Sequence, residues 1–236
     1  IRIRMPGTDW TWNDLVRGEV TFAAEHVPDY VIVRATGEPL YTLTNPVDDV
    51  LMEVTHVLRG EDLLSSTPRQ LALFDALKAC GVAKGDRPQY GHLPYVMGEG
   101  NKKLSKRDPE SSLLMYREEG YLPEGLINYL ALLGWSFGDD IEFFSKEQMA
   151  TVFDVERVNA NPARFDLKKC TAINAEWMRA LPLEDLTARL IPYLKSDGVF
   201  TADPTPEQLA TLAAVVPHVQ ERMETLRQGC LLYTSP

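Results

Sequence analysis

The run 103–107 (KLSKR) places two lysines on either side of a serine, directly after a stretch that contains two glycines. Lys103 and Lys106 each carry a compact ammonium charge on a flexible stem. Such groups can follow phosphoryl oxygens as negative charge develops on them, without the rigid geometry of a guanidinium. Together with Ser105, they predict a mobile loop that binds a polyphosphate. A solvated basic turn has the same composition, so the upstream sequence must distinguish the two interpretations.

Upstream of this loop, the sequence predicts a strand, a loop and a helix. The β-branched apolar run Val54–Leu58 predicts the strand. Thr67 is expected to cap the helix and Pro68 suits its first position, with apolar residues at helical spacing until Gly81. Arg59 then lies just past the carboxyl end of the strand, where open parallel sheets bind ligands.

Arg59 has a second interpretation, a surface ion pair with Glu61 or Asp62, which follow it closely in the sequence. Its position alone does not separate this structural role from a ligand role. No spacing of His, Cys, Asp or Glu residues in this region suggests a metal site. The choice between a structural role and a ligand role for Arg59 therefore depends on how the neighbouring motifs are arranged along the chain.

A second polar cluster precedes the strand. Val31–Ala35 and Leu40–Leu43 are expected to form two strands around a turn that contains glycine and proline. Asn45 is expected to cap a short helix that begins at Pro46. The pair Asp48–Asp49 would then lie in the first helical turn, where the helix dipole favours negative charge.

Four sequence blocks follow one another along the chain: Tyr41–Asp49 (YTLTNPVDD), Thr55–Gln70 (THVLRGEDLLSSTPRQ), His92–Pro94 (HLP) and Lys103–Arg107 (KLSKR). In this order and spacing they closely resemble bacterial glutamyl-tRNA synthetase, a class I aminoacyl-tRNA synthetase. The resemblance continues through residues 120–135 and 165–169 and fades after about Leu194. It therefore covers most of the chain.

The resemblance implies roles for residues in the first two blocks. Tyr41, Asn45 and Arg59 correspond to side chains that contact the glutamate substrate in this family. The implied reaction joins L-glutamate to tRNA(Glu) through a glutamyl-adenylate, with no covalent enzyme intermediate. An arginine suits a carboxylate because its planar fork matches the two oxygens. A glutamate–tRNA ligase is therefore the expected enzyme.

The resemblance also implies an ATP site. The KLSKR block corresponds to the family's KMSKS signature, so Lys103, Ser105 and Lys106 are expected to act in catalysis by closing over ATP, with Lys106 foremost. His92 is expected to end a strand and support the floor of the ATP site, on weaker grounds. Mg²⁺ would be held chiefly through the phosphates. Neither a metal-ligating residue nor a zinc site is expected in this chain.

Three rival functions remain. Glutaminyl-tRNA synthetase shares the ancestry but departs from the sequence of residues 59–62 (RGED). Glutamyl-queuosine tRNA(Asp) synthetase resembles the first two blocks but characteristically stops near the catalytic domain, whereas residues 108–230 continue here. A rival of another class is a catalytically inactive tRNA-binding fragment. The family's HIGH-type motif has no counterpart in the sequence, so a fragment lacking the first half of the catalytic domain, inactive alone, is expected.

The expected fold class is α/β: the second half of a doubly wound, Rossmann-like catalytic fold, followed by a mostly helical stem-contact domain. Residues 1–40 would be a remnant of the acceptor-binding insertion and residues 41–107 the nucleotide-binding half. By resemblance, residues 108–185 form the stem-contact domain. Residues 186–236 would begin the helical anticodon-binding region, most of which is missing, with a tail that is truncated or an artefact of assembly.

The helical part carries clear local signals. Pro123–Leu133 repeats apolar residues at helical spacing. Ser145 and Gln148 form the sequence pattern of a capping box, as do Thr205 and Gln208. These patterns predict a helix at the first site and a helix start at each of the other two.

Composition is consistent with a cytoplasmic globular protein. The chain of 236 residues is 44% hydrophobic, has no apolar run long enough for a membrane span, and shows no signal peptide. Its three cysteines are too scattered for a disulfide framework or a zinc knuckle. The net charge of −10 disfavours a broad nucleic-acid surface, yet local basic stripes leave tRNA possible. We expect tRNA(Glu), L-glutamate and ATP as partners, and no membrane or DNA.

Overall fold

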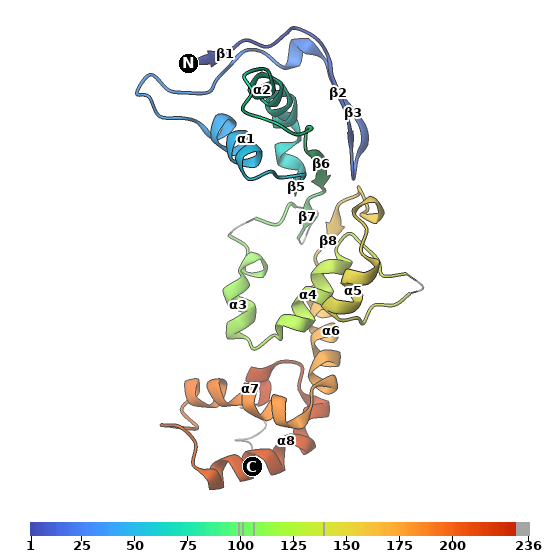
Figure 1. The fold of residues 1–236 in the computed structure, drawn as a ribbon. Coiled ribbons are helices and arrows are strands. Elements are labelled where there is room, and N and C mark those ends of the chain that lie inside the picture. The colour runs from blue at the N-terminus through green and yellow to red at the C-terminus, as the bar shows by residue number, and fades with distance from the viewer. Residues whose placement is uncertain (99, 101, 106, 139, 230–236) are drawn as a thin grey trace. The chain divides into compact units, whose positions relative to one another are not determined.

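The computed structural model describes residues 1–98, 100, 102–105, 107–138 and 140–229. The chain divides into two compact units (Figure 1). The first unit comprises Ile1–Tyr95 together with Asp154–Asn161, and the second comprises Val96–Phe153 together with Pro162–Pro236. Each unit is described by itself below. The predicted division into four domains stays a prediction.

The first unit combines short strands with two helices. Its elements are β1 (Arg2–Ile3), β2 (Trp10–Asp14), β3 (Gly18–Phe22), β4 (Tyr30–Val31), α1 (Tyr41–Leu51), β5 (His56–Gly60), α2 (Thr67–Ala79) and β6 (Gln89–Leu93), with 3₁₀ turns at Ala24–His26, Glu61–Ser66 and Val155–Arg157. The strands pair two by two: β1 with β4, and β2 with β3, are antiparallel, whereas β5 and β6 are parallel. The parallel pair, with α2 between its strands, forms a strand–helix–strand unit, of which the sequence predicts the first strand, the loop and the helix.

The local signals around α2 are largely confirmed. Strand β5 begins at His56, two residues later than predicted, and Ser66 rather than Thr67 occupies the N-cap position. Pro68 lies in the first helical turn, where its missing N–H costs nothing. The helix ends at Ala79, and Gly81 adopts the left-handed conformation (φ = 74°) that glycine tolerates best.

The predictions for the segment before β5 are largely wrong. Of the expected strand Val31–Ala35, only Val31 lies in a strand, β4, and a turn follows. Leu40–Leu43 is not a strand, because α1 already begins at Tyr41 and runs to Leu51. Asn45 and Pro46 therefore lie inside the helix, and Asn45 is not its cap. The alternation of threonine with apolar residues imitates a strand pattern, but the same residues also fit a helix face that packs on α2. Pro46 is the sixth residue of the helix, past the first turn, so the helix lacks the backbone N–H donor at this position.

This shift also changes the interpretation of the two aspartates. Asp48 and Asp49 lie near the carboxyl end of α1, not in its first turn. The helix dipole disfavours negative charge there, so helix-end stabilisation does not explain them. Asp48 is exposed, whereas Asp49 is partly buried.

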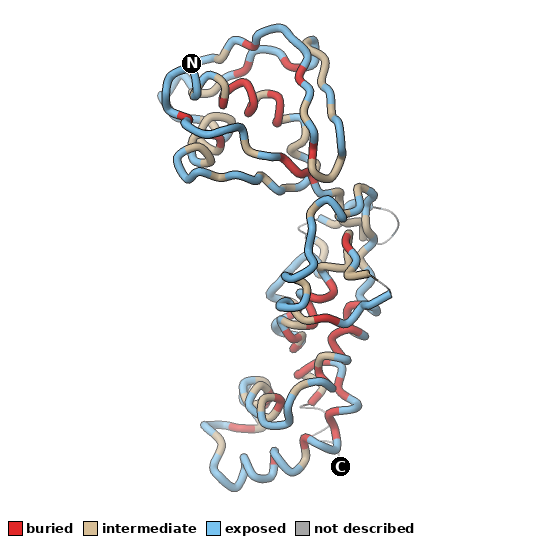
Figure 2. Tube along the Cα trace, turned by 45° about the vertical axis from the view of Figure 1, so that its right-hand side comes forward, coloured by how far each residue is buried: buried red, intermediate tan, exposed pale blue. Residues whose placement is uncertain are grey.

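The hydrophobic core of the first unit joins the amino-terminal strands to α2. Its buried members include Trp10, Tyr30, Leu71 and Tyr90, and they come from β2, β4, α2 and β6 respectively. Figure 2 shows buried residues along these elements, with exposed residues in the connecting segments. Two long-range hydrogen bonds reinforce this packing. Tyr30 donates its hydroxyl proton to the carbonyl of Arg69 (2.7 Å), and His92 on β6 donates its backbone N–H to Oδ1 of Asp14 on β2 (3.0 Å). The amino-terminal strands therefore belong to the same core as the parallel pair.

The second unit is mostly helical. Its elements are β7 (Val96–Met97), α3 (Leu113–Glu118), α4 (Pro123–Leu132), α5 (Lys146–Val152), β8 (Ala163–Arg164), α6 (Leu167–Ala180), α7 (Leu183–Ser196) and α8 (Pro206–Val219), with 3₁₀ turns at Pro109–Ser111 and Gln220–Arg222. Strand β7 pairs with β8 in parallel. The predicted helix at Pro123 is confirmed, and both capping boxes form, with Ser145 and Thr205 as N-caps. An α/β unit followed by a helical one is the fold class that the sequence predicts.

Two hydrophobic clusters hold the second unit together. One surrounds α4 and α6 and includes Leu126, Tyr129 and Ile173. The other joins α7 and α8, with Leu190 and Val216 among its buried members. None of the helices in the described part of the chain is long and apolar enough to cross a membrane.

Candidate functional site

Arg59 is the best-connected of the predicted site residues. It lies on β5, one residue before the strand ends, and its side chain is partly buried. Its Nε donates to Nε2 of His92 (3.1 Å), and Nη2 donates to the hydroxyl of Thr67 (2.9 Å) and more weakly to the carbonyl of Leu63 (3.4 Å). Its Nη1 is buried and has no hydrogen-bond partner among the described residues. Arg59 therefore keeps a donor for a further acceptor.

The expected alternative for Arg59, an ion pair with Glu61 or Asp62, does not form. Glu61 instead pairs with Arg17 from the loop between β2 and β3, and also accepts the backbone N–H of Tyr95 (3.0 Å). A guanidinium that is partly buried without a carboxylate partner is costly unless a ligand completes it. This arrangement favours a ligand role for Arg59.

The electrostatic surroundings of Arg59 bring Tyr41 and Asp49 beside it. Burial lowers the pKa of Arg59, while Tyr90, Tyr41 and Asp49 act in the opposite direction. Burial raises the pKa of Asp49, and Arg59 counteracts this rise. The Tyr90 ring lies under the guanidinium, with its centroid 5.4 Å from Cζ, and burial raises the pKa of Tyr90 to about 12. The site thus pairs one cation with polar groups from α1 and β6.

Three polar side chains share one face of α1. Tyr41, Asn45 and Asp49 are spaced four residues apart, so they lie above one another on the helix. Asn45 accepts a hydrogen bond from Nε2 of Gln70 on α2 (3.0 Å), and Gln70 Oε1 is buried without a partner among the described residues. The helix at 41–51 therefore places both predicted α1 residues on the side of Arg59 and Gln70.

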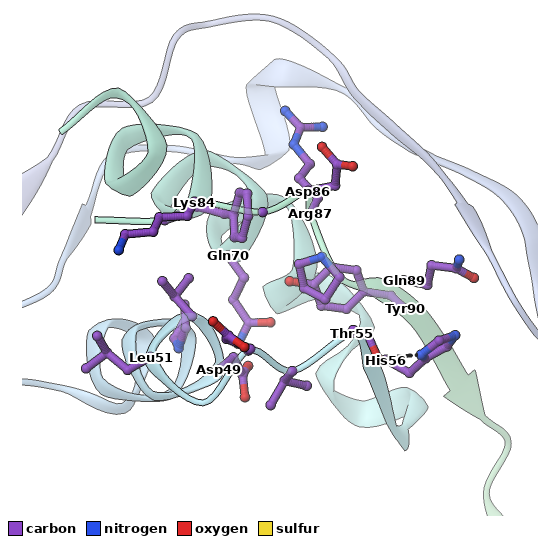
Figure 3. A pocket seen from close by; sticks show the side chains of 18 of the residues that line it. Asp49, Leu51, Thr55, His56, Gln70, Lys84, Asp86, Arg87, Gln89 and Tyr90 are labelled. Atoms are coloured by element: carbon purple, nitrogen blue, oxygen red, sulfur yellow. Dashed lines mark hydrogen bonds between the residues drawn. The ribbon is translucent and has the colours of Figure 1, made fainter. Parts of the chain in front are cut away.

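A cavity of about 600 Å³ opens between α1, α2 and the starts of β5 and β6. Figure 3 shows Asp49, Gln70 and Tyr90 around it, with Lys84 and Arg87 contributed by the segment before β6. Arg59, Tyr41 and His92 do not line this cavity. The cavity shares Asp49 and Tyr90 with the surroundings of Arg59. It was not predicted from the sequence.

His92 lies one residue before the end of β6, close to the predicted strand end, and its side chain is fully buried. Nδ1 is 2.5 Å from Oδ2 of Asp14, and Nε2 faces both Arg59 Nε and the Thr67 hydroxyl at 3.1 Å. Both ring nitrogens are thus engaged by the protein itself. A role for His92 at the floor of an ATP site stays a prediction, and these contacts leave no ring nitrogen for a ligand.

The predicted phosphate loop lies in the second unit. Leu104 donates its backbone N–H to the carbonyl of Val96 (2.9 Å), so the loop returns to β7. Ser105 donates its N–H to Oδ2 of Asp108 (2.6 Å), and its hydroxyl accepts the N–H of Arg107 (3.2 Å). The side chains of Lys103, Ser105 and Arg107 are exposed. Lys106, the foremost candidate for ATP, lies outside the described residues.

The predicted site residues are divided between the two units. Tyr41, Asn45 and Arg59 belong to the first unit, as does His92, whereas the KLSKR loop belongs to the second. Sequence reasoning missed three participants: Asp14, Gln70 and Tyr90. The spacing of Tyr41, Asn45 and Asp49 would have signalled their shared face if the segment had been interpreted as a helix. Asp14 carries no local signal, because its partner is 78 residues away.

The described residues contain no group of three or more His, Cys, Asp or Glu side chains that could hold a metal ion. Cys80 and Cys170 are free thiols, and burial raises the pKa of Cys170 to about 12. The third cysteine lies outside the described residues. The described site residues of the first unit present a guanidinium, amides and phenols.

Comparison with known proteins gives the context of this site. A glutamate–tRNA ligase of Saccharopolyspora erythraea is 61% identical over 96% of the chain, and one of a Nocardioides species is 58% identical over 97%. The chain spans about half the length of these curated relatives, 45% and 46% respectively. A crystal structure of an Elizabethkingia meningosepticum glutamate tRNA ligase in complex with its amino acid matches 97% of the chain and 47% of that protein, with a TM-score of 0.81 and 29% identity.

A family model also matches residues 1–172, most of the chain, which include Arg59, His92 and the KLSKR loop. All of the residues proposed from the sequence for substrate contact therefore fall inside the matched segment. The family match, the parallel strand–helix–strand unit and the relatives all indicate the same family. The chain belongs to the family of tRNA synthetases class I (E and Q), within the catalytic domain.

Proposed function

We propose that the protein to which this chain belongs ligates L-glutamate to tRNA(Glu), using ATP and passing through glutamyl-adenylate. The observation that carries the proposal is the identity of about 60% with glutamate–tRNA ligases over nearly the whole chain. The family model alone covers enzymes for both glutamate and glutamine, so the relatives are what favour glutamate. The unpaired donor of Arg59 supports this choice, because an arginine side chain recognises a carboxylate rather than an amide.

Arg59 is proposed to bind glutamate through Nη1. The other guanidinium nitrogens already donate to His92, Thr67 and Leu63, so a carboxylate approaches Nη1 instead of the two-nitrogen edge that the sequence suggested. Nη1 is screened from solvent, so a neighbouring side chain must move before substrate reaches it. Tyr41 is half exposed and lies beside the guanidinium, which makes it the side chain that we expect to move.

The KLSKR loop is proposed to act on ATP. In the reaction, the α-carboxylate of glutamate attacks the α-phosphorus of ATP, and the bond to pyrophosphate breaks. Lys103 and Lys106 would offset the negative charge that develops on the phosphates, and Ser105 would donate to a phosphate oxygen. Mg²⁺ would enter bound to the phosphates. His92 would support the ATP floor through the position of β6, since its ring is already engaged.

The test is glutamate-dependent exchange of labelled pyrophosphate into ATP, with and without tRNA(Glu). We would compare this chain alone with a chimera in which it replaces the matching segment of the Saccharopolyspora erythraea ligase. We expect exchange only in the chimera and only with tRNA(Glu). The proposed site of this reaction is the cytoplasm, where tRNA and ATP are available.

Three other outcomes would change the proposal. Exchange without tRNA would favour the queuosine-type enzyme, whose reaction begins with free adenylate. A chimera that binds tRNA but does not exchange pyrophosphate would show that this chain acts as a binding module. Exchange that depends on glutamine in place of glutamate would assign the other member of the family.

A further inference from the structure

The last residue of β2, Asp14, reaches the end of β6. Oδ1 of Asp14 accepts three backbone N–H groups, from Val16 (3.1 Å), Arg17 (3.1 Å) and His92 (3.0 Å). Oδ2 faces Nδ1 of His92 at 2.5 Å, and both side chains are fully buried. Oδ1 therefore accepts hydrogen bonds from the backbone, and Oδ2 contacts the histidine ring.

The proton on His92 is fixed by what faces each ring nitrogen. Arg59 Nε can only donate, so Nε2 of His92 must accept, and the ring proton resides on Nδ1. Nδ1–H then donates to Oδ2 of Asp14, which as a carboxylate can only accept. The direction of both hydrogen bonds is therefore determined: Arg59 donates to His92, and His92 donates to Asp14.

The orientation of the Arg59 guanidinium depends on this acceptor. The Nε–H bond to His92 and the Nη2–H bond to Thr67 fix the plane of the guanidinium, and this plane determines where the unpaired Nη1 points. Thr67 is itself buried and lies 3.1 Å from His92 Nε2, so the same ring nitrogen contacts both. A change of tautomer would place a donor against Arg59 Nε and disrupt this arrangement.

We propose that Asp14 is a positioning residue for substrate binding: it holds His92 in the Nδ1–H tautomer, and His92 in turn orients Arg59 toward the carboxylate of glutamate. The inference rests on the proposed function in one respect, the role of Arg59 in binding glutamate. It assigns a task in the amino acid site to the last residue of β2, a segment that the resemblance places in the acceptor-binding insertion.

The informative variant is Asp14→Asn, which keeps the size of the side chain. The amide oxygen can still accept the three backbone N–H groups, and the amide nitrogen then faces His92 Nδ1. A donor at that position forces the proton onto Nε2, where it opposes Arg59 Nε–H. In the chimera, we expect the KM for glutamate to rise about 10-fold, as for the loss of one hydrogen bond to a charged group, with the KM for ATP unchanged.

The matched control is Trp12→Phe. Trp12 Nε1 also donates to Oδ2 of Asp14, at 3.4 Å, and Phe keeps a ring to stack on Phe22. This variant removes a contact to the same oxygen without imposing a tautomer on His92. We expect its KM for glutamate to stay within twofold of the parent. A rise equal to that of Asp14→Asn would show that general loosening of the β2–β3 hairpin is responsible, and would overturn the inference.

The tautomer can be read directly from side-chain ¹⁵N–¹H correlation spectra of the chain labelled in its four histidines, with His92→Gln to assign the signals. We expect the Nδ1–H tautomer in the parent and the Nε2–H tautomer in Asp14→Asn. An Nε2–H signal in the unmodified chain would overturn the inference without any variant having to fold. A tautomer that switches while the KM for glutamate does not change would overturn it as well.

Arg59→Ala separates this inference from the proposed function. If Arg59→Ala raises the KM for glutamate and Asp14→Asn does not, only the positioning role of Asp14 fails. If Arg59→Ala leaves the KM for glutamate unchanged, the proposed binding role of Arg59 fails, whatever Asp14→Asn does.

Discussion

The two regions proposed to act on substrates are built differently. Arg59 is held by three hydrogen bonds from its guanidinium, beneath which Tyr90 packs, and its neighbour His92 is fully buried. The KLSKR loop returns to β7 through backbone hydrogen bonds, but its side chains at Lys103, Ser105 and Arg107 are exposed. The first region is partly buried, and the described side chains of the second are exposed.

This difference corresponds to two chemical tasks. A pocket that selects one amino acid gains from a fixed donor, because misplacing it weakens binding of the right substrate and discrimination against the wrong one. A loop that handles phosphates must follow charge as it moves from ATP to pyrophosphate, which suits exposed lysines. We therefore expect changes in the first region to alter the KM for glutamate, and changes in the second to alter the rate.

The sharpest test of this contrast is Lys106→Ala in the chimera. We expect pyrophosphate exchange at saturating substrates to slow by about 100-fold, since one electrostatic stabiliser of the transition state is lost. The KM for glutamate should stay within twofold. Lys146→Ala, which removes an exposed lysine at the start of α5, serves as the control and should leave the rate unchanged. An unchanged rate in Lys106→Ala would remove the distinction between the regions.

The converse variant is Arg59→Ala. We expect the KM for glutamate to rise by about 30-fold, equivalent to about 2 kcal/mol for a hydrogen bond to a charged group, with the rate at saturating glutamate changed less. Steady-state exchange at varied glutamate measures both. Arg34→Ala is the control, because Arg34 forms an exposed ion pair with Glu38 in the same unit. A fall in rate without a rise in KM would assign Arg59 to catalysis instead of recognition.

The buried character of the Arg59 region also predicts a pH-dependent stability. Burial raises the pKa of Asp14, but hydrogen bonds from His92, Arg17 and Val16 outweigh this and hold it well below its usual value. The depressed pKa means that Asp14 stabilises the fold fully above about pH 4, near the pKa of an unfolded aspartate, and progressively less as pH falls further.

Asp14→Asn tests this directly, because asparagine does not titrate. We expect the variant to unfold several degrees below the parent at pH 7. At pH 3 the parent should have lost about 1 kcal/mol of the Asp14 contribution, so the difference in Tm should narrow. Calorimetry of both chains at the two pH values measures it. A difference in Tm that does not depend on pH would show that Asp14 is not held as a carboxylate.

The sequence was most informative where the signals are local. The capping boxes at Ser145 and Thr205, the start of α2 near Thr67 and the end of that helix before Gly81 each depend on residues within a few positions. Hydrogen bonds between neighbours along the chain determine such features, so composition and spacing suffice to predict them. The sequence predicts the strand, loop and helix of this region, but not the parallel pairing of β5 with β6.

The site itself could be predicted only in part. The motifs identify Tyr41, Asn45 and Arg59. The local pattern, however, predicts a strand at Tyr41 and a helix cap at Asn45. The pattern fails because packing of α1 on α2 determines the conformation of this segment. Asp14 could not be found, since its contact with His92 joins positions 78 residues apart. Long-range contacts between buried polar groups leave no periodic trace in a sequence.

The smallest expected effect, and the one that compares both regions in one experiment, is that of salt. Between 0.1 M and 1 M salt the Debye length falls from about 10 Å to about 3 Å, which weakens exposed charges more than buried ones. In the chimera at saturating tRNA(Glu), we expect the KM for ATP to rise several-fold and the KM for glutamate to change less than twofold. Potassium chloride and potassium acetate should act alike, because ionic strength and not a specific anion is responsible. Equal rises of the two KM values would mean that Arg59 meets its substrate in a site as open as the KLSKR loop, and that burial of the guanidinium does not persist when glutamate binds.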